Sequence, residues 1–127
     1  MTIRALRILF AGVFLVMLWV TTWASSDRSV LVAFGQLWQD PWGRATLFDA
    51  YFGFLTFYVW LAYKERGPIR RLVWFVAVMG LGNFAIAGYL LWQLWRLPPS
   101  APIEDLLLER PFSTKRLLVF LHRYLDI

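Results

Sequence analysis

Three apolar runs dominate the hydrophobic pattern of this chain. Residues 8–26 carry no charge, residues 45–63 carry one, and residues 72–95 carry none. About 20 apolar residues cross the hydrocarbon core of a bilayer as a helix, and a helix satisfies its own backbone hydrogen bonds inside lipid. The pattern predicts an all-α fold, an integral membrane three-helix bundle with spans at about 5–26, 41–65 and 71–96.

Helix and turn signals separate the three runs. Apolar residues recur at helical spacing from Val30 to Trp38, which predicts a short helix on the membrane surface, with an irregular loop as the alternative. Asp40-Pro41 is typical of a helix start, since Asp caps free N–H groups and Pro is tolerated in the first turn. Gly67-Pro68 ends the second helix just before the third run, so the helices of runs two and three should form an antiparallel hairpin.

The C-terminal part has a different pattern. Residues 98–102 are rich in proline, and residues 113–126 are amphipathic. Their apolar stretch is too short to span a bilayer, so we expect an amphipathic helix on the membrane or on a partner. The chain thus divides into a three-span domain at 1–97 and a tail at 98–127. A signal peptide is the alternative for the first run, because Arg4 and Arg7 precede it and small residues lie near Ala24.

Composition narrows the class of protein. The 127 residues are 60% hydrophobic and 17% charged, and a soluble domain of this size has too small a core for such apolar content. An ordinary water-soluble enzyme and a disordered chain are therefore excluded. The net charge is +5, and the basic residues lie mainly at the ends of the apolar runs. That placement favours lipid headgroups over nucleic acid as the partner.

The basic residues also predict an orientation. The turn 64–71 holds four of them, and Arg4 and Arg7 lie near the N-terminus. The positive-inside rule places both regions on the cytoplasmic side. Three spans then place the loop 25–44 and the C-terminal tail outside, in what we expect to be a bacterial inner membrane.

Asp49 is the most informative polar residue. A charged carboxylate at membrane depth costs roughly 3 kcal/mol or more, so Asp49 should face other helices, a water pocket or a partner, or else be protonated. Helical rise places Asp49 about 12 Å into its span and Asn83 about 17 Å from the inner end of the next, so their depths nearly coincide. We expect Asp49 and Asn83 to meet, with Tyr51 nearby. Three roles are open for these polar residues. They could pack the helices together, form a proton-relay, ligand or pigment site, or contact a larger partner.

Other chemistry is sparse. The single histidine, His122, lies in the tail without a partner at ligand spacing, which favours a surface role over a metal site. Gly80-Leu81-Gly82 lies within an apolar run, where close helix packing explains glycine better than phosphate binding. We predict no catalytic residue, metal or cofactor. The aromatic content of 19% leaves room for a bound lipid or pigment.

Several short motifs resemble those of a known family. They are Asp40-Pro41-Trp42, Ala45-Thr46-Leu47-x-Asp49-x-Tyr51, Trp60-x-x-Tyr63-Lys64-Glu65, Leu81-Gly82-Asn83 and Pro102-Ile103-x-x-Leu106-Leu107-Leu108-x-Arg110. From about Leu6 to Arg110 the chain is similar to a family of small three-span membrane proteins of unknown function found in bacteria and plants. The resemblance implies fold and membrane location but no reaction. It also implies a role for Asp49, Tyr51 and the cytoplasmic-turn residues Lys64 and Glu65.

Two classes of function remain. Small size, the missing catalytic constellation and two lateral helices suited to docking favour a non-enzymatic accessory or assembly subunit of a larger membrane complex. Its partners would be membrane lipids and other membrane protein subunits. The alternative is a small membrane enzyme or carrier for a lipid, isoprenoid or pigment, with Asp49 as acid/base group supported by Asn83 and Tyr51. Ion or proton conduction is the weakest candidate, since three spans with one acidic residue make a poor pathway.

Overall fold

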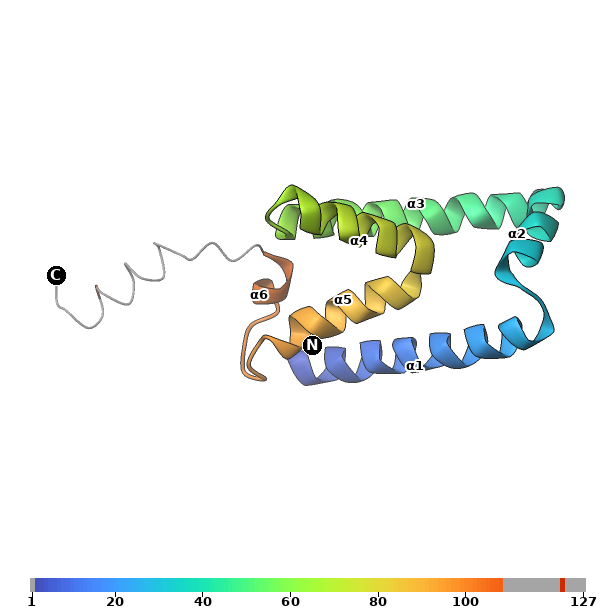
Figure 1. Ribbon diagram of the computed structural model, residues 1–127. Helices are drawn as coiled ribbons and strands as arrows, with labels where there is room; N and C mark the ends of the chain where they lie inside the picture. The colour runs from blue at the N-terminus through green and yellow to red at the C-terminus, as the bar shows by residue number, and fades with distance from the viewer. Residues whose placement is uncertain (1, 109–121, 123–127) are drawn as a thin grey trace.

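The computed structural model describes residues 2–108 and residue 122, and its elements are helices (Figure 1). In chain order they are α1 (Ile3–Asp27), α2 (Val30–Gln39), α3 (Pro41–Lys64), α4 (Pro68–Leu81), α5 (Asn83–Trp95) and α6 (Glu104–Leu107). The prediction of an all-α fold is confirmed for this part of the chain. The amphipathic helix predicted at 113–126 falls outside the described residues, apart from His122, which is exposed.

Two long helices, α1 and α3, form opposite sides of the molecule and run in opposite directions (Figure 1). They have 25 and 24 residues, so each is about 36 Å long and exceeds a bilayer core of about 30 Å. Both are apolar enough to cross a membrane. Little of either helix is buried, unlike the core helix of a soluble protein that passes the same test of length and composition.

Side-chain caps fix where the long helices begin. The Thr2 hydroxyl accepts a hydrogen bond from the Ala5 N–H at 3.1 Å, and the Asp40 carboxylate accepts one from the Gly43 N–H at 2.6 Å. Each cap satisfies a backbone donor that the first turn leaves without a helical partner. Pro41 occupies the first turn of α3. The helix therefore starts where the Asp-Pro pair predicted.

The short helix α2 lies at the end of the molecule where α1 stops and α3 starts (Figure 1). It packs against α3 so closely that a Cβ atom at Gly43 would collide with the carbonyl oxygen of Leu37. The Trp38 ring lies 6.1 Å from that of Phe48, between centroids. A short helix is thus present where the spacing of apolar residues predicted one, and the irregular-loop alternative is wrong.

The third apolar run is not one helix. α4 ends at Leu81 and α5 begins at Asn83, with Gly82 between them at φ +57°, where residues with side chains rarely lie. A Cβ atom at Gly82 would come within 2.7 Å of the Phe54 ring. The chain reverses there, and α5 returns toward the end from which α4 came (Figure 1). The prediction of a continuous span at about 71–96 is wrong, because this run forms a helical hairpin with arms about 20 Å long.

Contacts at the tip and along α5 fix the depth of the α4–α5 hairpin. Its tip lies against Phe54, near the middle of α3. Phe84, just past the tip, packs edge-on against Phe14 of α1 with ring centroids 5.5 Å apart. At the other end of α5, the Arg7 guanidinium donates to the Leu94 carbonyl oxygen at 3.0 Å. The hairpin enters between α1 and α3 from the N-terminal end of the molecule and returns to that end.

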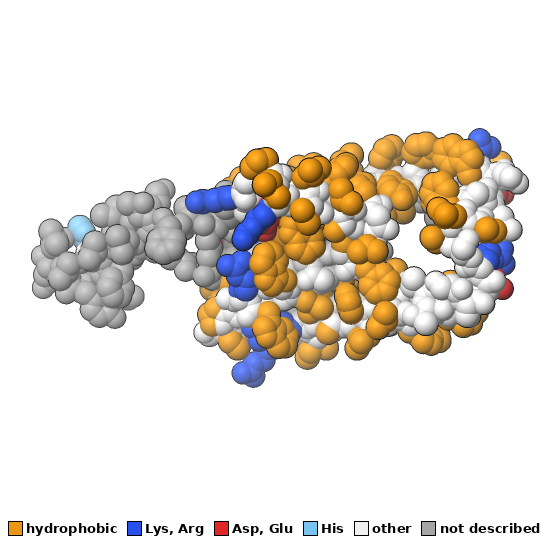
Figure 2. Space-filling model, in the orientation of Figure 1, with side chains coloured by type: hydrophobic (Ala, Val, Ile, Leu, Met, Phe, Trp, Pro, Cys, Tyr) orange, Lys and Arg blue, Asp and Glu red, His pale blue; other side chains and the backbone are white. Residues whose placement is uncertain are grey.

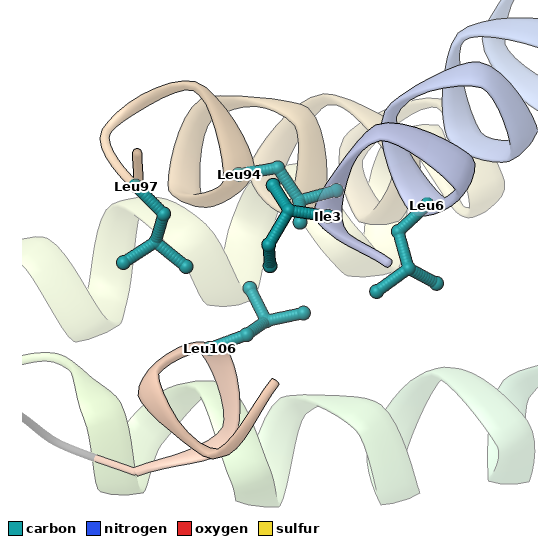
Figure 3. Close-up of a cluster of buried hydrophobic side chains, with 5 residues drawn as sticks. All are labelled: Ile3, Leu6, Leu94, Leu97 and Leu106. Carbon is teal, nitrogen blue, oxygen red and sulfur yellow. The ribbon is translucent and has the colours of Figure 1, made fainter. Parts of the chain in front are cut away.

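The start of the tail consequently lies beside the N-terminus. Figure 3 shows the buried side chains that bring α1, the end of α5 and α6 together. This terminal cluster consists of Ile3, Leu6, Leu94, Leu97 and Leu106. We predicted the N-terminus and the tail on opposite sides, but the described start of the tail lies at the same end of the molecule as the N-terminus, because the α4–α5 hairpin returns to that end (Figure 1). Residues 2–97 of the domain predicted at 1–97 contain the two long helices, the short helix α2 and the α4–α5 hairpin.

A second group of buried side chains, the central cluster, holds the hairpin against α3. It consists of Leu61, Val78, Ala85 and Tyr89. Full burial of a large apolar side chain contributes about 1.5–3 kcal/mol, so this small cluster stabilises the hairpin against α3. On its other side α5 packs extensively along α1. Elsewhere on α1 and α3, large apolar side chains point outward (Figure 2). Such an uncovered apolar surface is typical of helices that face lipid or a protein partner.

Candidate functional site

The polar cluster predicted at membrane depth does not form. Asp49 and Asn83 are both exposed, and neither has a hydrogen bond or ion pair to a side chain of the described residues. The expected meeting assumed a continuous third span. Because the chain reverses at Gly82, Asn83 lies at the hairpin tip opposite Phe54. Asp49 precedes Phe54 by five residues in α3, so it lies about 7.5 Å beyond the tip, toward the start of that helix.

Tyr51 is also exposed and does not join the other two. Its ring packs on Phe54, one turn along α3, with centroids 5.5 Å apart. Tyr51 therefore packs on Phe54, the side chain against which the hairpin tip lies. Asp49, Tyr51 and Asn83, which their depth along the helices predicted to lie together, are therefore not in contact with one another.

Asp49 shares one stripe of α3 with Gly53, Thr56 and Trp60, as helical spacing predicts. At the C-terminal end of this stripe, the Trp60 ring contacts the Tyr89 ring of α5, with centroids 5.9 Å apart. The stripe is thus covered by the hairpin near Trp60. Beyond the tip no described part of the hairpin reaches it, which leaves Asp49 uncovered.

A different pair of polar side chains is buried. Glu65, which ends α3, is 6% exposed, and Tyr89 of α5 is fully buried. The Tyr89 hydroxyl donates to Glu65 Oε1 at 2.9 Å. Arg70 Nη1 lies 3.8 Å from Glu65 Oε2, and Arg71 Nε donates to the Glu65 carbonyl oxygen at 3.0 Å. This Glu65 junction, made of Glu65, Arg70, Arg71 and Tyr89, ties α3, α4 and α5 together.

Aromatic rings surround the Tyr89 side chain. Trp74 is nearest, with its ring centroid 4.8 Å away and its plane nearly perpendicular to that of Tyr89. Three further rings approach edge-on at 5.9–6.1 Å, from Phe57, Trp60 and Trp92. Each such pair contributes about 0.5–1.5 kcal/mol beyond the area it buries. These rings hold the Tyr89 hydroxyl at the Glu65 carboxylate. The buried pair thereby joins α3 to α5 and is closed to solvent.

The short helix α6 is bound to this same end of the molecule. Trp60 Nε1 donates to the Leu107 carbonyl oxygen at 3.0 Å, and Lys64 Nζ donates to the Leu106 carbonyl oxygen. The Lys64 ammonium also lies 5.3 Å from the centre of the Trp60 ring. Lys64 and Glu65, singled out from the sequence as turn residues, therefore both take part in the fold here.

Sequence reasoning missed Tyr89 and Arg7. Tyr89 lies in an uncharged run, and its hydroxyl is the signal that could have marked it, since a buried Tyr nearly always finds a hydrogen-bond partner. Arg7 was assigned to membrane orientation. Its guanidinium instead donates to the carbonyl oxygens of Leu94 and Leu97 and lies 5.1 Å from the Trp95 ring centre. It satisfies carbonyl groups that the end of α5 leaves free.

A hollow of about 950 Å³ opens at the opposite end, between the last turns of α1 and α2 (Figure 2). It lies beyond the hairpin tip, where α1 and α3 have no helix between them (Figure 1). Its lining combines apolar side chains such as Val20 and Leu37 with polar ones such as Gln36. Within residues 2–108 and 122, no group of three metal-ligating side chains gathers.

Residues 3–113 match the family model described as "Protein of unknown function (DUF1475)". The chain belongs to this family. No curated protein and no solved structure matches it. The DUF1475 match spans both long helices, the hairpin and α6, and it confirms the expected membership in an uncharacterised family. The motifs quoted above and the range across bacteria and plants stay predictions.

Proposed function

We propose that this DUF1475 protein is a non-enzymatic integral membrane protein that serves as an accessory or assembly subunit of a larger membrane complex. In this proposal α1 and α3 cross a bacterial inner membrane, and the α4–α5 hairpin enters it and returns. The N-terminus and the basic turn after α3 lie on the cytoplasmic side, by the positive-inside rule. The tail then starts on that side as well.

The uncovered carboxylate of Asp49 carries this proposal. Asp49 lies eight residues from the start of α3, about 12 Å along a helix that exceeds the bilayer core. A charge at that depth costs roughly 3 kcal/mol, and no described side chain offsets it. A polar or basic group on another subunit would offset it, which makes the stripe of Asp49 a contact surface.

Asn83 supports the same conclusion from a second helix. It lies at the hairpin tip, exposed, with no hydrogen bond to a described side chain. Amides of this kind join helices within membranes, each hydrogen bond contributing about 1 kcal/mol. Two unsatisfied polar side chains, on α3 and at the hairpin tip, indicate a partner that extends across both.

Site-specific photo-crosslinking tests the proposal. A benzophenone amino acid at Gly53, one turn from Asp49 and with open space around it, should give one discrete adduct in the native membrane. The adduct should disappear when Asp49→Leu is added, because the partner's polar group loses its counterpart. The same probe at Val59, on a different face of α3, is the matched control and should give no such adduct. An adduct that persists in the Asp49→Leu chain would count against the proposal.

The hollow between the end of α1 and α2, which we call the end hollow, favours a second candidate. This candidate is a small membrane enzyme or carrier for a lipid, isoprenoid or pigment. A volume of about 950 Å³ is sufficient for a ligand of that size. Asp49 does not line the hollow, so its role as acid/base group requires the ligand to extend along α3. The Asp49→Asn variant separates the two candidates. Under this alternative it should keep its protein contacts and lose turnover or bound ligand.

A further inference from the structure

The end hollow combines an apolar wall with a charged rim. It has a volume of about 950 Å³ and lies between the last turns of α1 and the short helix α2. Part of the wall comes from Val30, Ala33 and Leu37, whose spacing places them on one side of α2. The charged side chains of the lining are Asp27, Arg28 and Asp40. A ligand that matches the hollow therefore has an apolar part and a charged part.

The wall and the rim lie at different depths of the proposed membrane domain. Val20, in the apolar wall, precedes Asp27 by seven residues, which is about 10 Å along α1. Trp19 and Trp23 are exposed near the end of the same helix, and tryptophan is enriched where membrane helices reach the lipid headgroups. The rim thus lies at headgroup depth, and the apolar wall extends toward the acyl chains. Figure 2 shows acidic and basic side chains at this end of the molecule.

The rim charges already have partners, and part of their hydrogen-bonding capacity is left over. Arg28 Nε donates to Asp27 Oδ2 at 2.7 Å, and Arg28 Nη1 donates to Gln36 Oε1. Asp40 Oδ2 accepts the Gly43 N–H in the cap of α3. A guanidinium has five N–H donors and a carboxylate has two acceptor oxygens. Three donors of Arg28, and Oδ1 of both aspartates, therefore have no hydrogen bond to the described residues.

This arrangement of charges favours a zwitterionic headgroup over an anionic one. Two carboxylates against one guanidinium leave the lining with a net charge of −1, which repels an added anion. The two remaining carboxylate oxygens can accept N–H groups, and the remaining guanidinium donors match phosphate oxygens. A headgroup with a primary ammonium and a phosphate satisfies both. A quaternary ammonium does not, because it has no N–H to donate.

We propose that the end hollow binds one phospholipid with a primary-amine zwitterionic headgroup, represented by phosphatidylethanolamine. Its ammonium would donate to Oδ1 of Asp27 and Asp40, and its phosphate would accept from Arg28, which keeps its bond to Asp27. One acyl chain would lie against Val20 and Leu37. The inference rests on the proposed membrane location and names the lipid class for the second candidate function. It requires neither a partner subunit nor a reaction.

Binding by the purified full chain in an uncharged, phosphate-free detergent tests the proposal. The probes are phosphatidylethanolamine, phosphatidylcholine and phosphatidylglycerol with identical acyl chains, and native mass spectrometry counts the bound lipids. Phosphatidylethanolamine should bind as one molecule per chain. Phosphatidylcholine, which has the same net charge but no N–H, and phosphatidylglycerol, which is anionic, should each bind about tenfold more weakly.

Charge variants decide whether the end hollow is the site. Asp27→Asn and Arg28→Gln should each weaken phosphatidylethanolamine binding about fivefold. Arg44→Gln is the matched control for Arg28, since it removes a basic charge from an exposed position at the same end, outside the lining. Glu104→Gln is the control for Asp27 and removes an exposed acidic charge from α6. Both controls should change binding less than twofold.

Two further variants separate binding from folding. Ala33→Phe adds volume to the apolar wall without changing its charge, and it should weaken binding about tenfold, which corresponds to about two displaced methylene groups. Asp27→Glu keeps the carboxylate and should retain binding within about threefold. Thermal unfolding in lipid-free detergent, followed by circular dichroism, shows for each variant that the helices are kept.

Three results would overturn the inference. One is that phosphatidylethanolamine does not bind the wild-type chain. Another is that phosphatidylcholine or phosphatidylglycerol binds as tightly, which would show that the ammonium N–H groups are not recognised. The third is that Arg28→Gln weakens binding no more than Arg44→Gln does. Because the purified chain is tested alone, each of these results leaves the crosslinking test of a partner subunit unaffected.

Discussion

At the scale of single residues, the Glu65 junction is where the chain concentrates its buried polar contacts. Tyr89 donates its hydroxyl to a carboxylate that is 6% exposed, and Arg70 approaches the same carboxylate from α4. Removing one partner of a buried carboxylate leaves that carboxylate desolvated and unsatisfied, which costs more than the hydrogen bond contributes.

Tyr89→Phe should therefore lower the free energy of unfolding by about 1–3 kcal/mol, although the ring and its aromatic contacts are kept. The matched control is Tyr58→Phe, whose hydroxyl donates to the Arg71 carbonyl oxygen at an exposed position, and we expect a change within about 0.5 kcal/mol. Denaturant unfolding in detergent, followed by tryptophan fluorescence, measures both. Equal effects of the two variants would contradict the assignment of a structural role to the junction.

Sequence reasoning identified some of these residues and misplaced others. Lys64 and Glu65 were singled out through a family resemblance, and the break at Gly67-Pro68 placed them in a turn. Neither signal predicted the burial of Glu65 or its hydrogen bond to Tyr89. Asp49 was identified as a costly charge, and it is exposed. Its pairing with Asn83 failed because depth along a helix determines a contact only when the neighbouring helix continues to that depth.

At the scale of elements, the α4–α5 hairpin is the decisive feature. Its turn depends on Gly82, which combines φ +57° with a close approach to the Phe54 ring. Gly80, two residues earlier, is an ordinary helical glycine with open space around its Cα. The two glycines look alike in the sequence, yet only one of them is required by the turn.

Gly82→Ala should destabilise the protein by about 1–3 kcal/mol, because the new Cβ requires a backbone conformation that alanine rarely adopts and meets Phe54. Gly80→Ala should leave stability unchanged or raise it by up to about 1 kcal/mol, since alanine is the better helix former. Thermal unfolding of the two variants in the same detergent makes the comparison. If Gly82→Ala proves as stable as Gly80→Ala, the hairpin turn is not as described.

The hydrophobic pattern predicted the positions of the long helices and missed the reversal for a physical reason. Caps and turn residues such as Asp40 and Pro41 act locally, so the start of α3 can be read from its neighbours. The uncharged run 72–95 has the same composition whether it forms one helix or, as here, most of α4, Gly82 and all of α5. Packing of the hairpin against Phe54 and Phe14 selects the second arrangement, and those contacts are distant in sequence.

At the scale of the whole molecule, the hairpin makes the two ends different. Near the N-terminus, α1, α3, α4, α5 and α6 pack together around the terminal cluster and the Glu65 junction (Figure 1). Beyond the hairpin tip, α1 and α3 are separated by the end hollow, and Asp49 is uncovered. The partner subunit that we propose would contact the open end, where Asp49 is uncovered.

The central claim is that two helices cross the membrane and the third apolar run returns to the side from which it came. The chain contains no cysteine, so single cysteines can be introduced without background. A membrane-impermeant maleimide should label Ser100→Cys from the same side as Arg66→Cys, and Ser26→Cys from the opposite side. Labelling of Ser100→Cys from the side of Ser26→Cys would show three crossings and contradict the re-entrant hairpin.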